Sequence, residues 1–216
     1  MPQGKDAFHW IALKTVLIIF LVFVLQNIIP ELTGAFSLKK DFWTQPWTAL
    51  TYIFLHGSFT HLFSNAFSLF IFGSMLEKIV GYRNFLTVFF VTGVLSGVLG
   101  VLFYDSVIGA SGSAFGIMGV LGLLRPKMVV WALGVPMYMT VAIIVYAVLD
   151  MAGLFFPSNI AHIGHISALV MGIVIGLLWK KRYGIVETPK ENKIAIGEQE
   201  LRKWEEEYMI PKKKRS

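Results

Sequence analysis

The sequence lacks cysteine altogether and is poor in charged residues. Without a thiol, the 216-residue chain can have no disulfide framework, no cysteine nucleophile and no thiolate metal site. Charged side chains make up 15% of the chain, 56% is hydrophobic, and the mean hydropathy is +0.67. Soluble proteins carry about 25% charged residues. The composition therefore excludes a soluble enzyme, a disordered chain and a nucleic-acid binder, despite the net charge of +6, and indicates a polytopic membrane protein.

Half of the charges lie near the end of the chain. Residues 182–216 hold 9 basic and 7 acidic residues of the 32 in the sequence. We therefore expect a membrane-embedded domain over 1–181 and a charged cytoplasmic tail over 182–216. In the tail, apolar residues recur at the spacing of a short, solvated amphipathic helix, namely Leu201, Trp204 and Tyr208. The basic run 212–215 would attract anionic lipid.

Six apolar segments come close to the ~20 residues that a helix needs to cross a bilayer. They cover about 11–29, 57–76, 84–104, 109–124, 136–156 and 162–179. We expect an all-α, six-helix membrane bundle whose fourth helix is short and recessed. Basic residues gather on one side of these segments, which predicts a cell-membrane protein with both termini in the cytoplasm. Tryptophan and tyrosine in the first outer loop, about 30–56, indicate that this loop lies on the membrane.

Polar side chains inside these segments are the candidate functional residues, because they are costly in a membrane. Four of them share a depth of roughly 18–24 Å, counted at 1.5 Å per residue from the charged inner ends: Ser111, His165, His61 and Asn65. By the same count His162 and His56 lie closer to the outer surface. Groups at one depth would line a cavity that admits water from outside.

Ser111 and His165 are the minimal hydrolytic pair. A serine hydroxyl becomes a nucleophile when a base takes its proton, and neutral histidine is the usual base near pH 7. His165 would then return the proton to the leaving amine. Small residues at four-residue spacing around Gly172, and around Gly116 on the fourth segment, predict that the two helices pack closely.

Hydrogen-bond donors for an oxyanion are available on the second segment. His61 and Asn65 are four residues apart, hence on one helix face, and offer an imidazole and an amide N–H. The backbone N–H of Ser111 would be a third donor, because it falls in the first turn of a helix. Supporting roles are expected for four neighbours: Gly109 and Gly112, which leave room for a substrate backbone, Phe115, which shares the face of Ser111, and His56, which supports the loop.

Three motifs occur in order on these segments: His61-xxx-Asn65, Gly109-Ala110-Ser111-Gly112, and a histidine leading a glycine-rich sixth helix. Together they resemble the rhomboid family of intramembrane serine proteases, over roughly residues 40–180. The resemblance implies a dyad of Ser111 and His165 with His61 and Asn65 at the oxyanion. It also implies that the substrates are themselves transmembrane helices.

The base is chosen between two histidines. Ser167-Ala168 stands where the family has Gly-Gly after the catalytic histidine, so the choice of His165 rests on Gly172, seven residues later. His162 is the alternative and would otherwise bond to the loop before it. Many relatives also have an arginine after the loop tryptophan, whereas here Thr48 follows Trp47.

Asp150, on the fifth segment, has two interpretations. It could orient His165 as a third member of a triad, but the family resemblance implies a dyad, which favours a structural hydrogen bond. Structural alternatives exist for the other polar residues too. Ser111 could be only a helix N-cap, and His61 and Asn65 could only join helices.

Two other classes of protein are alternatives to the protease. A catalytically inactive rhomboid-like protein that holds membrane clients would be expected to lack Ser111 or the histidine, and both are present. A metal transporter or metalloprotease would use the histidines, but no H-E-x-x-H motif occurs and Asp150 is the only acid within the six segments. We expect no metal and no cofactor. The expected partners are transmembrane protein substrates and the lipid bilayer, not nucleic acid.

Overall fold

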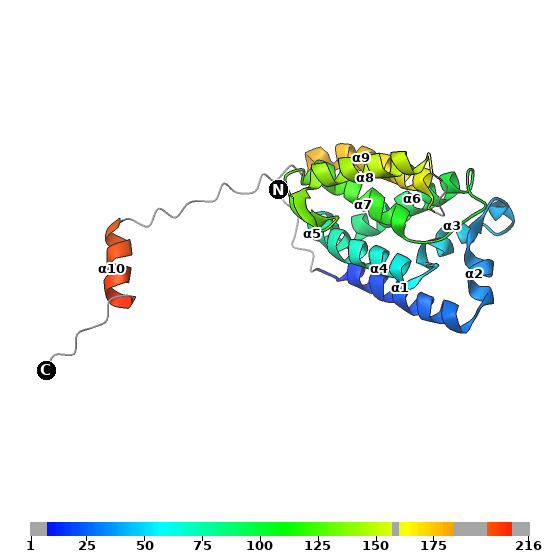
Figure 1. Cartoon of the computed structure of the whole chain (residues 1–216), viewed down its shortest axis with the longest axis horizontal. Helices are drawn as coiled ribbons and strands as arrows, with labels where there is room; N and C mark the ends of the chain where they lie inside the picture. Colours follow the sequence, from blue (N-terminus) through cyan, green and yellow to red (C-terminus); the bar gives the residue numbers. More distant parts are fainter. Residues whose placement is uncertain (1–7, 157–159, 184–197, 209–216) are drawn as a thin grey trace. The chain divides into compact units, whose positions relative to one another are not determined.

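The computed structural model describes residues 8–156, 160–183 and 198–208. The chain divides into two compact units, residues 1–185 and 186–216, which are described separately. The first unit is a helical bundle in which α7 (Ser111–Leu124) is surrounded by neighbouring helices, with α1 (Ile11–Ile28) and α9 (His162–Tyr183) on opposite sides in the view of Figure 1.

The helices of the bundle follow the apolar segments closely. Four are long and apolar enough to cross a membrane: Ile11–Ile28, Phe59–Val80, Tyr82–Gly100 and His162–Tyr183. The second of these runs without interruption through α4 (Phe59–Ser68), the π-helical turn Leu69–Gly73 and α5 (Ser74–Val80), and the third is α6. The two shorter apolar helices are α7 and α8 (Met139–Gly153). The protein is therefore a multi-pass helical membrane protein, and a count of six crossings remains a prediction.

The fourth apolar helix is short, as the sequence predicts. α7 has 14 residues, which at 1.5 Å per residue extend over roughly 21 Å, less than the ~30 Å hydrocarbon core. Gly109 precedes it with φ of 115°, a conformation that glycine adopts most readily. The Gly109 N–H donates to the Tyr52 carbonyl at 2.9 Å. This bond ties the start of α7 to the loop between α1 and α4.

Glycines let the backbones of α7 and α9 touch. A Cβ added at Gly172 would collide with the Gly116 carbonyl, and one at Gly119 would lie 2.5 Å from the Leu169 carbonyl oxygen. The predicted close packing of these two helices is thus confirmed. At Gly112 the absent side chain makes room for Ser96 of α6, and the expected approach of a substrate backbone there stays a prediction.

Glu77, one residue beyond the segment expected at 57–76, is a second buried acid in the membrane helices. Its carboxylate lies in the continuous helix 59–80 and is 3% exposed as a residue. It accepts hydrogen bonds from the backbone N–H groups of Ile11 and Ala12 at 3.1 and 2.9 Å. These N–H groups begin α1 and have no helical partner, so Glu77 caps α1 from the neighbouring helix.

The loop between α1 and α4, predicted to lie on the outer side, is a folded structure made of short elements. It contains α2 (Glu31–Phe36), β1 (Leu38–Lys39), the 3-10 turn Phe42–Thr44, α3 (Thr48–Thr51) and the 3-10 turn Tyr52–Phe54. β1 pairs antiparallel with β2 (Ser106–Val107), and Lys40 forms a 2.7 Å ion pair with Asp105. That pair lowers the pKa of Asp105. Trp43 and Trp47 stay exposed, which is consistent with a loop that lies on a membrane.

A β-hairpin, which the sequence analysis missed, separates α7 from α8. β3 (Val129–Ala132) pairs antiparallel with β4 (Val135–Tyr138), and both residues of the turn, Leu133 and Gly134, have positive φ. Such turns suit the twist of paired strands. The fifth apolar helix consequently begins at Met139, not at 136 as expected.

The second unit is described only for α10 (Glu198–Tyr208). It confirms the short helix predicted in the tail. The side chains of Trp204 and Tyr208 and the basic run 212–215 lie outside the described residues, so the predicted amphipathic face and lipid attraction remain predictions.

Candidate active site

Ser111 and His165 meet where α7 begins beside α9. His165 Nε2 lies 2.7 Å from Ser111 Oγ, which is hydrogen-bonding distance. Ser111 is the first residue of α7, and the first helical hydrogen bond there joins Ala114 N–H to the Ala110 carbonyl. The backbone N–H of Ser111 therefore lies before the first N–H group that forms a hydrogen bond within the helix. The His165 side chain keeps 12% of its surface exposed, so the pair is not sealed.

Ser113, two residues on, faces another helix. Its hydroxyl is fully buried and donates to the Phe89 carbonyl of α6 at 2.7 Å. The two serines of Ser111-Gly-Ser113 therefore have separate roles: one contacts an imidazole, and the other joins α7 to α6.

Aromatic packing holds the His165 ring. Phe115 stacks on it with ring centroids 4.5 Å apart and 12° between the planes. Tyr146 of α8 packs edge-on against Phe115 at 5.9 Å. The structure thus confirms that Phe115 shares the face of Ser111 and reaches the histidine ring.

His61 and Asn65 lie on the same side of α4, against the loop that leads into α7. A Cβ added at Gly109 would be 2.7 Å from the His61 Nε2 atom and 3.8 Å from Asn65 Nδ2. Gly109 therefore leaves room for the His61 ring, and the expected approach of a substrate backbone there stays a prediction.

Local hydrogen bonds fix these two side chains. Ser58 caps α4 by accepting from the His61 N–H at 3.1 Å. The Gly57 N–H points to His61 Nδ1 at 3.4 Å, which leaves Nε2 as the nitrogen that carries the proton in a neutral ring. Asn65 Nδ2 donates one N–H to the His61 carbonyl at 2.9 Å, and its second N–H is available to another acceptor.

His56 is buried behind His61, with ring centroids 5.0 Å apart. Its backbone is held by Gln26 of α1, whose amide accepts from the His56 N–H at 3.0 Å and donates to the His56 carbonyl at 3.3 Å. Burial and the neighbouring His61 lower the pKa of His56 to about 4, so the ring is neutral near pH 7. The supporting role expected of His56 stays a prediction.

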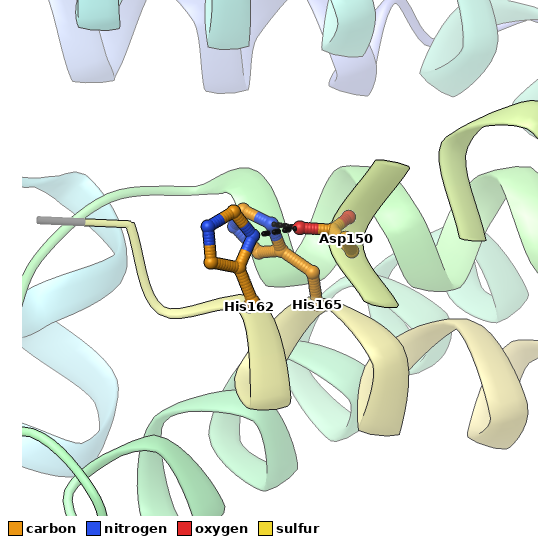
Figure 2. Close-up of side chains that lie close together, drawn as sticks. All are labelled: Asp150, His162 and His165. Atoms are coloured by element: carbon orange, nitrogen blue, oxygen red, sulfur yellow. Dashed lines mark hydrogen bonds and ion pairs between the residues drawn. The ribbon is translucent and has the colours of Figure 1, made fainter. Parts of the chain in front are cut away.

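Asp150 contacts both histidines of the α9 N-terminus (Figure 2). Its Oδ1 lies 2.6 Å from His162 Nδ1 and 3.0 Å from His165 Nδ1. The structure thus brings His165 to Ser111 and directs His162 to Asp150. The sequence favours a structural hydrogen bond for Asp150 and offers His165 as one partner. Its spacing in the chain carries no signal that one carboxylate would meet two rings on another helix.

Comparison with known proteins supports the helical membrane fold. A family model described as the Rhomboid domain matches residues 43–182. The candidate rhomboid protease YdcA of Bacillus subtilis (strain 168) is 31% identical over 139 residues, which cover 61% of this chain and 66% of YdcA. Rhomboid protease GluP of the same organism is 28% identical over 180 residues, 79% of this chain and 34% of GluP. RHOMBOID-like protein 4 of Arabidopsis thaliana is 29% identical over 142 residues, 64% of this chain and 36% of that protein.

The fold and the site define a helical multi-pass membrane protein with a serine beside a histidine. Because the family model covers more than half of the sequence, the chain belongs to the rhomboid family. The matches span between about a third and two thirds of the lengths of the three relatives.

Proposed function

We propose that the protein is an intramembrane serine endopeptidase that hydrolyses peptide bonds in or near the transmembrane helices of membrane-protein substrates. The observation that carries the proposal is the 2.7 Å separation of Ser111 Oγ and His165 Nε2 at the start of a helix. Residues 1–181 would hold the activity in the cell membrane, with both termini in the cytoplasm. Relatives named as rhomboid proteases support the reaction type.

Ser111 and His165 would act as a dyad. The Ser111 hydroxyl attacks the carbonyl carbon of the scissile peptide bond while His165 Nε2 takes the hydroxyl proton. The imidazolium then gives this proton to the leaving amine, and an ester between Ser111 and the substrate acyl group remains. Water, deprotonated by the same nitrogen, attacks the ester, and the proton returns to Ser111 Oγ as the carboxylic acid product leaves.

The negative charge on the tetrahedral intermediate needs donors that are already in place. The backbone N–H of Ser111 lies at the start of α7, and His61 Nε2 and the second amide N–H of Asn65 reach the Gly109 turn before it from α4. Removing one such donor typically costs about 2.7–4 kcal/mol of transition-state stabilisation. This arrangement accounts for polar residues that a helix with only a packing role would not need at this depth.

The test uses the full chain in proteoliposomes with a single-span model substrate that carries small residues near its outer end. Wild-type protein should cleave the substrate and react at Ser111 with a fluorophosphonate, located by mass spectrometry. Ser111→Ala should lose both activities. Ser113→Ala is the matched control, because it removes a neighbouring hydroxyl that faces α6, and it should keep the label.

Other outcomes would favour the other classes of protein. Cleavage that persists in Ser111→Ala would overturn the serine mechanism. Cleavage that a chelator abolishes would favour a metal-dependent protein. Binding of the substrate without cleavage by the wild-type protein would favour the inactive client-binding alternative.

A further inference from the structure

We propose that Asp150 is a positioning residue that fixes the tautomer and orientation of His165, and that His162 holds the Asp150 carboxylate in place. The inference rests on the proposed peptidase function and adds to its dyad a carboxylate on α8. Its starting point is that one oxygen, Asp150 Oδ1, lies 2.6 Å from His162 Nδ1 and 3.0 Å from His165 Nδ1 (Figure 2).

The two hydrogen bonds determine where the proton of His165 lies. An ionised carboxylate only accepts hydrogen bonds, so the Nδ1 atom that faces it must carry a proton. A neutral His165 with this proton has its lone pair on Nε2, the atom 2.7 Å from Ser111 Oγ. The other tautomer would present an N–H to Ser111 and could not take the hydroxyl proton. Asp150 therefore selects the form of His165 that can act as a base.

Asp150 also stabilises the charge that forms during the reaction. When His165 accepts the serine proton, an imidazolium lies beside the carboxylate at 3.0 Å. The Asp150 side chain is only 8% exposed, and attraction between opposite charges is stronger in such surroundings than in water. The carboxylate keeps its charge and transfers no proton itself, as in soluble Ser-His-Asp enzymes.

His162 is built to hold the carboxylate rather than to act as a base. Its side chain is 10% exposed, and its ring lies in the space beside Gly153, where an added Cβ would collide with three ring atoms. A buried carboxylate that lacks partners is costly, and the Nδ1–H of His162 gives Oδ1 a second donor. The ring of His162 therefore restrains the carboxylate of Asp150, and this carboxylate in turn contacts His165.

The separations favour hydrogen bonds over a shared metal ion. The three ligand-type atoms lie within 4.8 Å of one another, and a tetrahedral zinc ion with bonds of about 2.0–2.2 Å would hold its ligands roughly 3.3–3.5 Å apart. The observed 2.6 and 3.0 Å are ordinary N–H···O distances. Dependence on a metal is accordingly an outcome that would count against the proposal.

The first experiment measures kcat and KM of Asp150→Asn in the full chain in proteoliposomes. The amide keeps the shape of the side chain but no longer dictates the tautomer, so kcat should fall about 10²-fold or more, towards the ~10⁴-fold seen for this change in a soluble triad. KM should stay within about twofold, because the carboxylate acts through His165 and does not bind substrate. His162→Ala, which removes only one donor to the carboxylate, should lower kcat less than about fivefold. A wild-type kcat for Asp150→Asn would overturn the proposal.

The second measurement does not depend on the folding of any Asp150 variant. In wild-type protein labelled with ¹⁵N-histidine, and with His165 assigned by comparison with His165→Ala, the neutral ring should be protonated on Nδ1 and bare on Nε2. A ring protonated on Nε2 would contradict the proposal, as would activity that is lost on chelation. If the wild-type protein cleaves, Ser111→Ala does not, and Asp150→Asn is unchanged, only the role of Asp150 fails. If Ser111→Ala cleaves, the peptidase mechanism itself fails.

Discussion

The rings of Phe115 and His165 lie almost parallel, with 12° between their planes and 4.5 Å between their centroids. The two residues belong to different helices, α7 and α9, and the stack therefore sets the plane of the imidazole relative to the helix that carries Ser111. Hydrogen bonds on both ring nitrogens then fix its rotation. The ring is held on its face as well as on its edge.

Phe115→Ala should lower kcat about tenfold, because the imidazole loses the surface that fixes its plane and small displacements of catalytic groups are costly. Phe115→Tyr keeps the aromatic face and should retain most of the activity. Steady-state cleavage of the model substrate measures both. Equal rates for the alanine variant and the wild-type protein would mean that the two hydrogen bonds alone position the ring.

His165→Ala should abolish cleavage, because it removes the base that faces Ser111, whereas His162→Ala should lower kcat less than about fivefold. Thermal unfolding of both variants in detergent checks that neither loss reflects misfolding. If His162→Ala were inactive and His165→Ala active, the base would be assigned to the wrong turn of α9.

Asn65→Ala should lower kcat about 10²-fold if its free amide N–H serves the oxyanion. Ser64→Ala is a suitable control: Ser64 also bonds to the carbonyl four residues before it, but on the exposed side of α4. Its turnover should match the wild-type protein. An Asn65→Ala variant with undiminished turnover would leave Asn65 only its hydrogen bond to the His61 carbonyl.

Gly172→Ala should destabilise the bundle by about 1–3 kcal/mol, because its methyl group would meet the Gly116 carbonyl and push α7 and α9 apart. The same shift should separate Ser111 from His165 and lower turnover. Gly34→Ala is the matched control, since nothing lies within 4 Å of a Cβ there. Thermal unfolding and cleavage are measured on both, and equal midpoints would show that the helix contact tolerates the methyl group.

The sequence predicted much of the bundle because membrane helices follow from long apolar runs. The segments near 11–29 and 84–104 correspond to Ile11–Ile28 and Tyr82–Gly100, and the fourth is short as expected. The hairpin before Met139 was missed, since its strands are as apolar as the helix that follows them. The contact of Gly112 with Ser96 was not predicted either, because a small residue does not reveal which neighbouring side chain needs the space.

For the candidate site, the sequence supplied the residue types and the tertiary structure supplied their partners. Ser111, His61 and Asn65 could be selected as polar groups in apolar segments because burying them is costly without a purpose. The choice between two histidines three residues apart depends on the rotation of α9 against α7, and the partner of Asp150 depends on the position of α8. Helix rotation is set by side-chain packing between segments far apart in the chain. The local sequence therefore fixed which helices form and which polar groups they carry, and only the packed bundle decided which of those groups meet.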